Sequence, residues 1–333
     1  MTSSEKAAVR LSIVIPVYRS MEVLPELINQ VKAALLGSEY GADFEMVLVN
    51  DCSPDGSWPV IERLARENSF VRGISLRKNV GQHNATMAGL CNARGDIIVI
   101  MDDDLQHPPA AILALARSIE DGNDVCYTRY RGRKHAAWKI WGSWLNDRVA
   151  EVVLKKPRGL YLSSFKAMSR DIAMSVIGYD GPYTYIDGLI LGTTSSITSI
   201  EIDHQERWAG EGNFNFTRSL SLWLKMATSL SIYPLRMATI SGFALATLSL
   251  FLLGYVVIER LIHPKISPGW TSTIATILLI GGLQMVFLGI LGEYIGRIYV
   301  RINKAPQFSV GKTTFKITED KRTAEQSDRV QPF

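Results

Sequence analysis

The stretch DIIVIMDDDLQHPP, residues 96–109, decides the fold class of this chain. Its first half is a short apolar run between acidic residues, which predicts a buried strand. Its second half ends in two prolines, which suit the first turn of a helix. A strand that leads through a polar turn into a helix is the repeating unit of an alternating α/β protein.

The same unit recurs on both sides of this stretch. Other apolar runs rich in valine and isoleucine are LSIVIPV (11–17), FEMVLVND (44–51), VRGISLR (71–77) and DVCYTR (124–129). Helical stretches separate them, so we predict an α/β domain with a mainly parallel sheet. No GxGxxG follows the first run and no GxxxxGKS or GxxxxGKT occurs, which disfavours a dinucleotide-dependent oxidoreductase and a P-loop NTPase.

Counted along the chain, there are five apolar runs, and acidic residues follow the second (44–51) and the fourth (96–102). The second run ends in ND at 50–51, and the fourth leads into DDDLQ at 102–106. Ligands bind parallel sheets at the carboxyl ends of the strands, and neighbouring carboxylates repel unless a hard divalent cation shares their oxygens. We predict Mg²⁺ or Mn²⁺ with a diphosphate there, with Asp102 and Asp104 on one side of an extended backbone and Asp103 turned away. The alternative is an acidic N-cap of the following helix.

Charge is distributed unevenly along the chain. The 333 residues include 36 basic and 32 acidic ones, for a net charge of +4, but residues 237–292 contain only three charges. The uncharged runs 237–258 and 266–292 each reach the roughly 20 residues that cross a bilayer. We predict two membrane-spanning helices joined by a turn at 263–269; the alternative is a pair of buried helices in a soluble bundle. The modest net charge disfavours a nucleic-acid-binding protein.

Basic residues at both ends of the predicted hairpin set its expected orientation. Arg236 precedes the first span, and Arg297, Arg301 and Lys304 follow the second, so both ends are expected in the cytoplasm. The N-terminus lacks the apolar stretch of a signal peptide, which agrees with a cytoplasmic N-terminal domain. The expected parts are a cytoplasmic catalytic domain over 1–213, interfacial helices over 214–236, two transmembrane helices over 237–296 and a partly disordered cytoplasmic tail over 297–333.

A basic and aromatic segment follows the fifth apolar run. Residues 129–139 contain five cations and no acid, and Trp138, Trp141 and Trp144 lie at helical spacing. Tryptophan beside lysine on an amphipathic helix is typical of a segment in the lipid interface, where it can bind an anionic headgroup. The alternative is a solvated basic loop followed by a core helix.

Five motifs occur in order along the chain: IPVY (15–18), VNDCSPDGS (49–57), RKNVGQHNATMAGL (77–90), MDDDLQHPP (101–109) and LGEYIGRIY (291–299). With them the chain resembles family-2 glycosyltransferases of the polyprenyl-phosphate type. The resemblance implies a GT-A-type nucleotide-diphospho-sugar transferase fold with a C-terminal two-helix transmembrane hairpin. It also implies inverting, metal-dependent transfer of a sugar from a nucleoside-diphosphate sugar, by preference a UDP-sugar, to undecaprenyl phosphate. The reaction is expected at the cytoplasmic face of the inner (plasma) membrane, for cell-envelope glycan or lipopolysaccharide modification.

The resemblance also implies roles for individual residues of this sequence. The donor site is expected to comprise Pro16, Tyr18, Asp51, Arg77, Asn79, Gly81, Asp102, Asp103 and Arg207. Mg²⁺ or Mn²⁺ is expected on Asp104, Gln106 and Asp102, and the lipid phosphate on Arg129, Arg131 and Lys139. For Asn79 and Gly81 a plain strand-to-helix turn is the alternative.

The chain departs from the family pattern in three places. RS at 19–20 replaces an Asn-Glu pair, GLY at 159–161 lacks a family carboxylate, and GNF at 212–214 lacks a family lysine. Asp187, in YIDGL, is a candidate substitute for the missing carboxylate. A phosphate acceptor is already mostly dianionic at neutral pH, so a missing base is tolerable. The candidate catalytic residues are therefore Asp102, Asp104, Arg129 and Asp187.

Two other functions stay open on the sequence alone. A processive polysaccharide synthase is suggested by QERW at 205–208, which is one residue short of the QxxRW motif of such enzymes. The other is a non-catalytic membrane scaffold on a transferase fold, although the intact acidic motifs argue against it. The five histidines have no metal-ligand spacing and are interpreted as structural or incidental. Expected partners are a nucleotide sugar, a polyprenyl phosphate and the membrane, with no nucleic acid, and a homo-oligomer is an open alternative.

Overall fold

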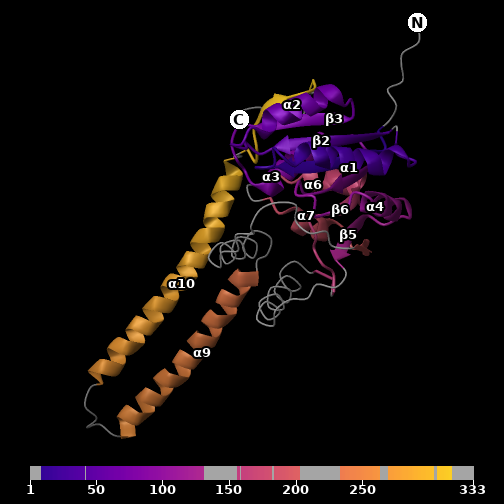
Figure 1. Ribbon diagram of the computed structural model, residues 1–333. Helices are drawn as coiled ribbons and strands as arrows, with labels where there is room; N and C mark the ends of the chain where they lie inside the picture. Colours follow the sequence, from indigo (N-terminus) through magenta and orange to yellow (C-terminus); the bar gives the residue numbers. More distant parts are fainter. Residues whose placement is uncertain are drawn as a thin grey trace, which may run out of the picture.

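The computed structural model describes residues 9–41, 43–130, 156–157, 159–181, 184–202, 233–262, 269–303 and 306–316. Its strands are β1 (Leu11–Val17), β2 (Phe44–Asn50), β3 (Val71–Leu76), β4 (Ile97–Ile100), β5 (Val125–Tyr130), β6 (Lys166–Ser169), β7 (Ile197–Ile202) and β8 (Val310–Thr313). They form one sheet in the order β7-β5-β6-β4-β1-β2-β3-β8 (Figure 1). β6 runs antiparallel between β4 and β5, and β8 runs antiparallel beside β3, whereas the other neighbouring strands are parallel.

Helices cover both faces of this sheet. They are α1 (Leu24–Leu36), α2 (Ser57–Glu67), α3 (Gln82–Leu90), α4 (Ala111–Glu120), α6 (Arg170–Ile177) and α7 (Ile186–Thr193). One buried apolar cluster contains residues of α1, α2 and α4, and a second contains residues of α3, α6 and α7. Every residue of β1 and β2 is buried, as expected for central strands covered on both sides. The predicted α/β fold with a mainly parallel sheet is confirmed.

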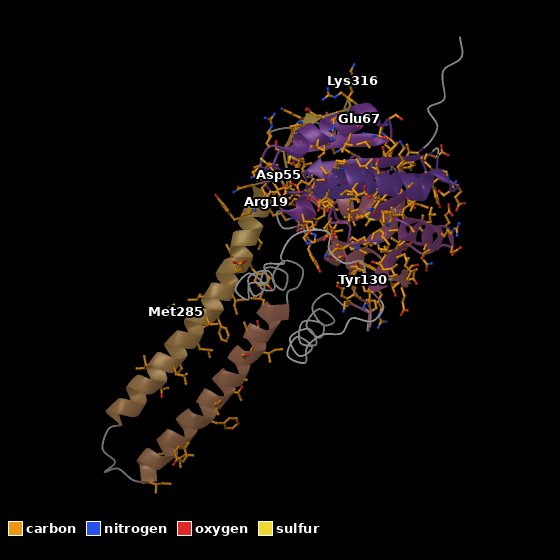
Figure 2. The ribbon with its side chains drawn as sticks, in the orientation of Figure 1. Arg19, Asp55, Glu67, Tyr130, Met285 and Lys316 are labelled. Carbon is orange, nitrogen blue, oxygen red and sulfur yellow. The ribbon has the colours of Figure 1, made fainter. Side chains whose placement is uncertain are left out.

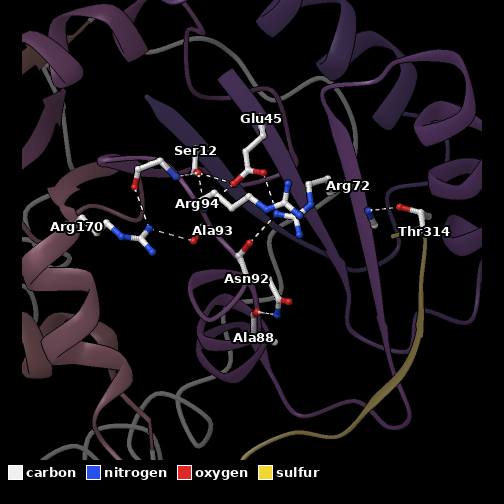
Figure 3. A network of polar contacts seen from close by, with 11 residues as sticks. Ser12, Glu45, Arg72, Ala88, Asn92, Ala93, Arg94, Arg170 and Thr314 are labelled. Atoms are coloured by element: carbon white, nitrogen blue, oxygen red, sulfur yellow. Dashed lines mark hydrogen bonds and ion pairs between the residues drawn. The ribbon is translucent and has the colours of Figure 1, made fainter. Parts of the chain in front are cut away.

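A buried polar network stabilises the amino edge of the sheet, away from the strand ends that lead into the acidic motifs (Figure 3). Arg72 of β3 donates to the Glu45 carboxylate of β2 (2.8 Å) and to the carbonyl of Asn92 (2.7 Å). Glu45 also accepts a hydrogen bond from the Ser12 hydroxyl of β1 (2.7 Å). The network therefore holds three neighbouring strands in a fixed relative position.

Two long helices, α9 (Tyr233–Ile262) and α10 (Trp270–Ile302), leave this domain as a hairpin (Figure 1). Large apolar side chains on both are exposed to an extent unusual for a protein in water; Phe251 and Leu279, for example, are 74% and 71% exposed. Among the described residues, one helix, Leu279–Ile302, is long and apolar enough to cross a membrane, with a mean hydropathy of 1.5. The hairpin agrees with the sequence analysis, and a crossing by α9 stays a prediction.

The segment after α10 returns to the sheet, which the sequence analysis did not predict. β8 pairs with β3, and Gly73 and Thr314 exchange two hydrogen bonds, from the Gly73 N–H to the Thr314 hydroxyl (2.9 Å) and from the Thr314 N–H to the Gly73 carbonyl (3.0 Å). The Gln307 amide donates to the carbonyls of Tyr179 (2.9 Å) and Gly181 (2.8 Å). Part of the expected tail over 297–333 is thus the edge strand of the catalytic domain.

Candidate active site

Three strained turns mark the carboxyl edge of the sheet. Arg19 after β1, Cys52 after β2 and Leu105 after β4 have φ values of 60°, 52° and 58°. Residues other than glycine rarely adopt this left-handed conformation, which costs of the order of 1–3 kcal/mol and is concentrated at functional sites. The strain therefore coincides with the strand ends at which an α/β sheet binds its ligands.

Asp51 connects the end of β2 to the turn before α3. It is buried, and its carboxylate accepts hydrogen bonds from the backbone N–H groups of Val80 (2.7 Å) and Gly81 (2.9 Å). The Asn79 side-chain amide donates to the Asp51 carbonyl (3.3 Å). Asn79 and Gly81 therefore form the strand-to-helix turn that was the alternative for them, and their contact with a donor stays a prediction.

Asp103 lies toward the turn after β1. Its carboxylate accepts hydrogen bonds from the Tyr18 N–H (3.1 Å) and the Ser20 hydroxyl (2.5 Å). Burial raises the pKa of Asp103 to about 6, although both hydrogen bonds oppose the rise. Tyr18 is exposed at this edge, whereas Pro16 is buried in β1 beside Val49 of β2. Their predicted contact with the nucleoside is not tested by this arrangement.

Asp55 holds the turns after β1 and β2 together. Its carboxylate accepts the N–H groups of Met21 (3.1 Å) and Ser57 (3.1 Å) and the hydroxyls of Ser53 (2.5 Å) and Ser57 (2.6 Å). The Ser53 hydroxyl oxygen in turn accepts the N–H of Arg19 (2.8 Å). Burial alone would raise the pKa of Asp55, but the hydrogen bonds outweigh it and lower the pKa to about 2. The sequence analysis missed this residue, whose only signal was its place in VNDCSPDGS.

Asp102 lies toward β6. One carboxylate oxygen accepts a hydrogen bond from the Gln82 amide (2.6 Å), and the other accepts one from the Ser164 hydroxyl (2.5 Å) and lies 3.3 Å from Nε2 of His107. Burial opposes the ionised form, but the contacts with His107 and Ser164 and the charge of Lys166 lower the pKa of Asp102 below its ordinary value. Asp102 is therefore held ionised.

His107 is a partner of the acidic cluster that the sequence analysis did not identify. His107 is 4% exposed, and its Nδ1 lies 2.5 Å from the hydroxyl of Tyr130 (Figure 2) at the end of β5. Nothing in the histidine spacing indicated this contact, because Tyr130 is 23 positions away in the chain. The only signal was the position of His107 directly after the acidic motif.

Asp104 is half-buried, and its carboxylate accepts the backbone N–H of Gln106 (3.1 Å). Within the described residues, no three His, Cys, Asp or Glu side chains are grouped so that they could hold a metal ion by themselves. Both oxygens of Asp102 already accept hydrogen bonds from the protein. A closed protein cage does not fit this donor set. It fits Mg²⁺ or Mn²⁺ that shares the Asp104 carboxylate with substrate phosphates and water.

Asp187 belongs to a buried ion pair. Its carboxylate contacts the Lys166 ammonium group and accepts a hydrogen bond from the Tyr127 hydroxyl (2.9 Å). Lys166 and Asp187 are only 3% and 7% exposed. The structure thus places Asp187 as the counter-ion of Lys166, and its role as a catalytic residue stays a prediction.

The structure describes two of the predicted cationic site residues, Arg77 and Arg129, and the others lie outside the described residues. Arg129 is exposed near the end of β5, with its backbone opposite Glu201 of β7. Arg77 is exposed after β3, and its N–H donates to the Ser309 carbonyl (2.9 Å). Outside the described residues lie Arg131, Lys139, Arg207, the tryptophans at 138, 141 and 144, the interfacial stretch 214–232 and the QERW sequence at 205–208.

Comparison with protein families gives two matches along the chain. The family described as glycosyl transferase family 2 matches residues 12–176, and the one described as the GtrB C-terminal hairpin matches residues 233–298. The first match covers the strands and turns of the acidic site, and the second covers α9 and most of α10.

Individual proteins similar to this chain agree with these matches. The undecaprenyl-phosphate 4-deoxy-4-formamido-L-arabinose transferase of Enterobacter sp. (strain 638) is 35% identical over 309 residues, which are 90% of this chain and 92% of that protein. The transferase of the same name from Shewanella sediminis (strain HAW-EB3) is 34% identical over 307 residues, 90% of this chain and 91% of that protein.

A solved structure shares the fold at lower identity. Glucosyl-3-phosphoglycerate synthase from Mycobacterium tuberculosis, in complex with Mn²⁺, uridine diphosphate and phosphoglyceric acid, superposes with a TM-score of 0.50 at 17% identity, over 68% of this chain and 78% of that chain. The family match, the similar transferases and the GT-A-like sheet agree: the chain belongs to glycosyltransferase family 2 and is a glycosyltransferase.

Proposed function

We propose that this glycosyltransferase moves a sugar from a nucleoside-diphosphate sugar, a UDP-sugar, to undecaprenyl phosphate at the cytoplasmic face of the inner membrane. The observation that carries the proposal is that one chain joins an acidic carboxyl edge to an exposed apolar hairpin. The names of the relatives at 34% and 35% identity support undecaprenyl phosphate as the acceptor. The lipid-linked sugar would serve cell-envelope glycan or lipopolysaccharide modification.

The donor is proposed to lie over the turns after β1, β2, β3 and β4. Asp51, Asp103 and Asp55 hold these turns through backbone hydrogen bonds, so the edge is already organised before a donor binds. The residues proposed to contact the nucleoside and diphosphate are Pro16, Tyr18, Asp51, Arg77, Asn79, Gly81, Asp102, Asp103 and Arg207.

A divalent cation, Mg²⁺ or Mn²⁺, is proposed on Asp104, with Gln106 and Asp102 beside it. When bound, it would stabilise negative charge on the leaving diphosphate. Asp104 supplies a carboxylate at the edge of the turn, while Asp102 stays ionised through its contacts with Ser164, His107 and Gln82. The Mycobacterium tuberculosis synthase structure contains Mn²⁺ together with uridine diphosphate, which supports a divalent ion in a protein of this fold.

The acceptor phosphate is proposed to bind at Arg129, with Arg131 and Lys139 following it in the sequence. A phosphate monoester is mostly dianionic at neutral pH and attacks without a general base. One of its oxygens would form the new bond to the anomeric carbon while the bond from that carbon to the donor diphosphate breaks, which inverts the configuration. Because the attacking oxygen of the phosphate dianion carries no proton, Asp187 need not accept one and can remain the counter-ion of Lys166.

The return of the chain to the sheet supports the proposed topology. β8 belongs to the same sheet as β1 to β7, so the chain contributes strands to this sheet both before α9 and after α10. A chain that starts and ends on one side of a membrane crosses it an even number of times. If the apolar α10 segment crosses, α9 must therefore cross as well.

The test is transfer by the full-length protein in detergent, with undecaprenyl phosphate, a panel of nucleotide sugars, Mg²⁺ or Mn²⁺, and mass detection of the lipid product. Asp104→Ala should abolish transfer, whereas Asp121→Ala, which changes an exposed acid at the end of α4, should leave it unchanged. A soluble oligosaccharide as the only product, or full activity of Asp104→Ala at saturating metal, would contradict the proposal.

A further inference from the structure

A continuous series of polar contacts runs along the carboxyl edge from the end of β4 to the end of β5. Asp102 is joined to Ser164 (2.5 Å), and His107 lies 3.3 Å from both of these side chains. His107 then contacts the hydroxyl of Tyr130, the last residue of β5 (2.5 Å). Tyr130 directly follows Arg129, so the series ends beside the residue proposed to bind the acceptor phosphate.

The directions of these hydrogen bonds follow from the groups themselves. A carboxylate only accepts hydrogen bonds, so Nε2 of His107 contacts Asp102 as a donor in the tautomer with the proton on Nε2. In that tautomer Nδ1 is the acceptor for the Tyr130 hydroxyl. Ser164 and Gln82 also donate to Asp102. Each donor in the series has an acceptor, and the series converges on Asp102.

The order of the strands in the sheet shows what this series of contacts connects. β6 lies between β4 and β5, so the residues at the ends of β4 and β5 are not backbone neighbours. His107 spans the gap, and its ring packs against Phe165 at 4.9 Å and parallel to the Tyr130 ring at 6.1 Å, measured between ring centroids. A buried, packed ring keeps one orientation, so it fixes the distance between Asp102 and the end of β5.

We propose that His107 and Tyr130 are positioning residues that hold the end of β5, with Arg129, at a fixed distance from Asp102. Neither side chain needs to touch a substrate. The inference rests on the proposed function, because it takes Asp102 as part of the donor side and Arg129 as part of the acceptor side. Attack on the anomeric carbon depends steeply on the placement of the acceptor phosphate, so a loosened β5 end lowers transfer more than donor binding.

Tyr130→Phe tests the inference because it removes a single hydroxyl and keeps the ring. We expect kcat/KM for undecaprenyl phosphate to fall about tenfold, the usual size of one lost buried hydrogen bond, with KM for the nucleotide sugar unchanged. His107→Phe should give a loss of the same kind, and the double variant should lose no more than His107→Phe alone. Tyr299→Phe, which removes a hydroxyl from a 66% exposed tyrosine of α10, is the control and should behave as the wild type. Equal losses for donor and acceptor, or no loss, would overturn the inference.

A second measurement needs no substrate. Hydrogen exchange of residues 128–130 in the full-length protein should be several-fold faster in Tyr130→Phe than in the wild type and unchanged in Tyr299→Phe. Unchanged exchange in Tyr130→Phe overturns the inference even if transfer is slowed. If the wild type transfers no sugar to undecaprenyl phosphate with any donor, the proposed function fails; faster exchange then still supports the link between Asp102 and β5, and unchanged exchange rejects it.

Discussion

At the scale of single residues, burial decides what an ionisable side chain can do. Asp187 was a candidate to replace a missing catalytic carboxylate, but it lies in contact with the buried Lys166 and the Tyr127 hydroxyl. Breaking such a pair by removing one partner leaves the other charge buried and uncompensated. The pair therefore has a structural effect that can be separated from catalysis by mutation.

Asp187→Asn is expected to lower the free energy of unfolding by about 3–5 kcal/mol, because it removes the counter-ion of a buried ammonium group. The measurement is the thermal unfolding of the full-length protein in detergent. Replacing both partners, Lys166→Met with Asp187→Leu, should recover much of the loss. If Asp187→Asn instead abolishes transfer with an unchanged unfolding midpoint, Asp187 is a catalytic residue.

Asp55 predicts a pH dependence whose sign follows from its lowered pKa. The pKa is about 2 in the fold against an ordinary value of 3.8, so the ionised form stabilises the fold above pH 3.8, and this contribution is lost as the pH falls through 2. Asp55→Asn should lower the unfolding temperature at pH 7 and lower it less at pH 3. Asp121→Asn is the control on an exposed acid. An equal difference at both pH values would show that the charge of Asp55 contributes nothing.

At the scale of elements, the turn between β3 and α3 depends on one backbone conformation. Gly81 has φ of +85° and ψ of 159°, a region that is open almost only to glycine, and a Cβ there would meet no atom within 4 Å. A substitution therefore tests the backbone and not the packing. The backbone N–H groups of Val80 and Gly81 in the same turn donate both hydrogen bonds that the Asp51 carboxylate accepts.

Gly81→Ala is expected to strain this turn by about 1–3 kcal/mol and to raise KM for the nucleotide sugar severalfold. Gly37→Ala is the matched control, because Gly37 has φ of −91° and equally free space around its Cβ position. Steady-state kinetics with varied donor separate the two variants. Unchanged KM in Gly81→Ala would place the donor away from this turn.

At the scale of the whole molecule, β8 follows α10 and belongs to the same sheet as β1 to β7, so we expect both ends of the hairpin on one side of the membrane. The native cysteines provide internal markers of that side, because Cys52 and Cys91 are exposed on the catalytic domain. Ser267 lies in the sequence between the two long helices.

In intact cells, a membrane-impermeant thiol reagent should label Ser267→Cys and leave Cys52 and Cys91 unlabelled, whereas inverted membrane vesicles should give the opposite pattern. The measurement is the mass of labelled peptides. The wild type without the added cysteine is the control. Labelling of Cys52 in intact cells would reverse the proposed orientation, and no labelling of Ser267→Cys from outside would argue against two crossings.

The sequence analysis predicted β1 to β5 closely and did not predict β6, β7 or β8. The predicted runs 11–17, 44–51, 71–77, 96–102 and 124–129 correspond to β1 to β5, because each is a short run rich in apolar or β-branched residues. β6, with the sequence KAMS, and β8, with VGKT, have no such pattern. Their pairing depends on strands that are distant in the chain, and local periodicity contains no information about it.

The sequence by itself determined the alternating α/β domain, the apolar hairpin and the acidic residues at the strand ends, because hydrophobic periodicity and strand direction are local properties of the chain. Only the tertiary structure decided which side chains meet the acids. Antiparallel insertion of β6 brings Ser164 to Asp102 and Lys166 to Asp187, and it sets the gap that His107 spans to Tyr130. These contacts join residues far apart in the chain, and packing of the whole sheet is what selects them.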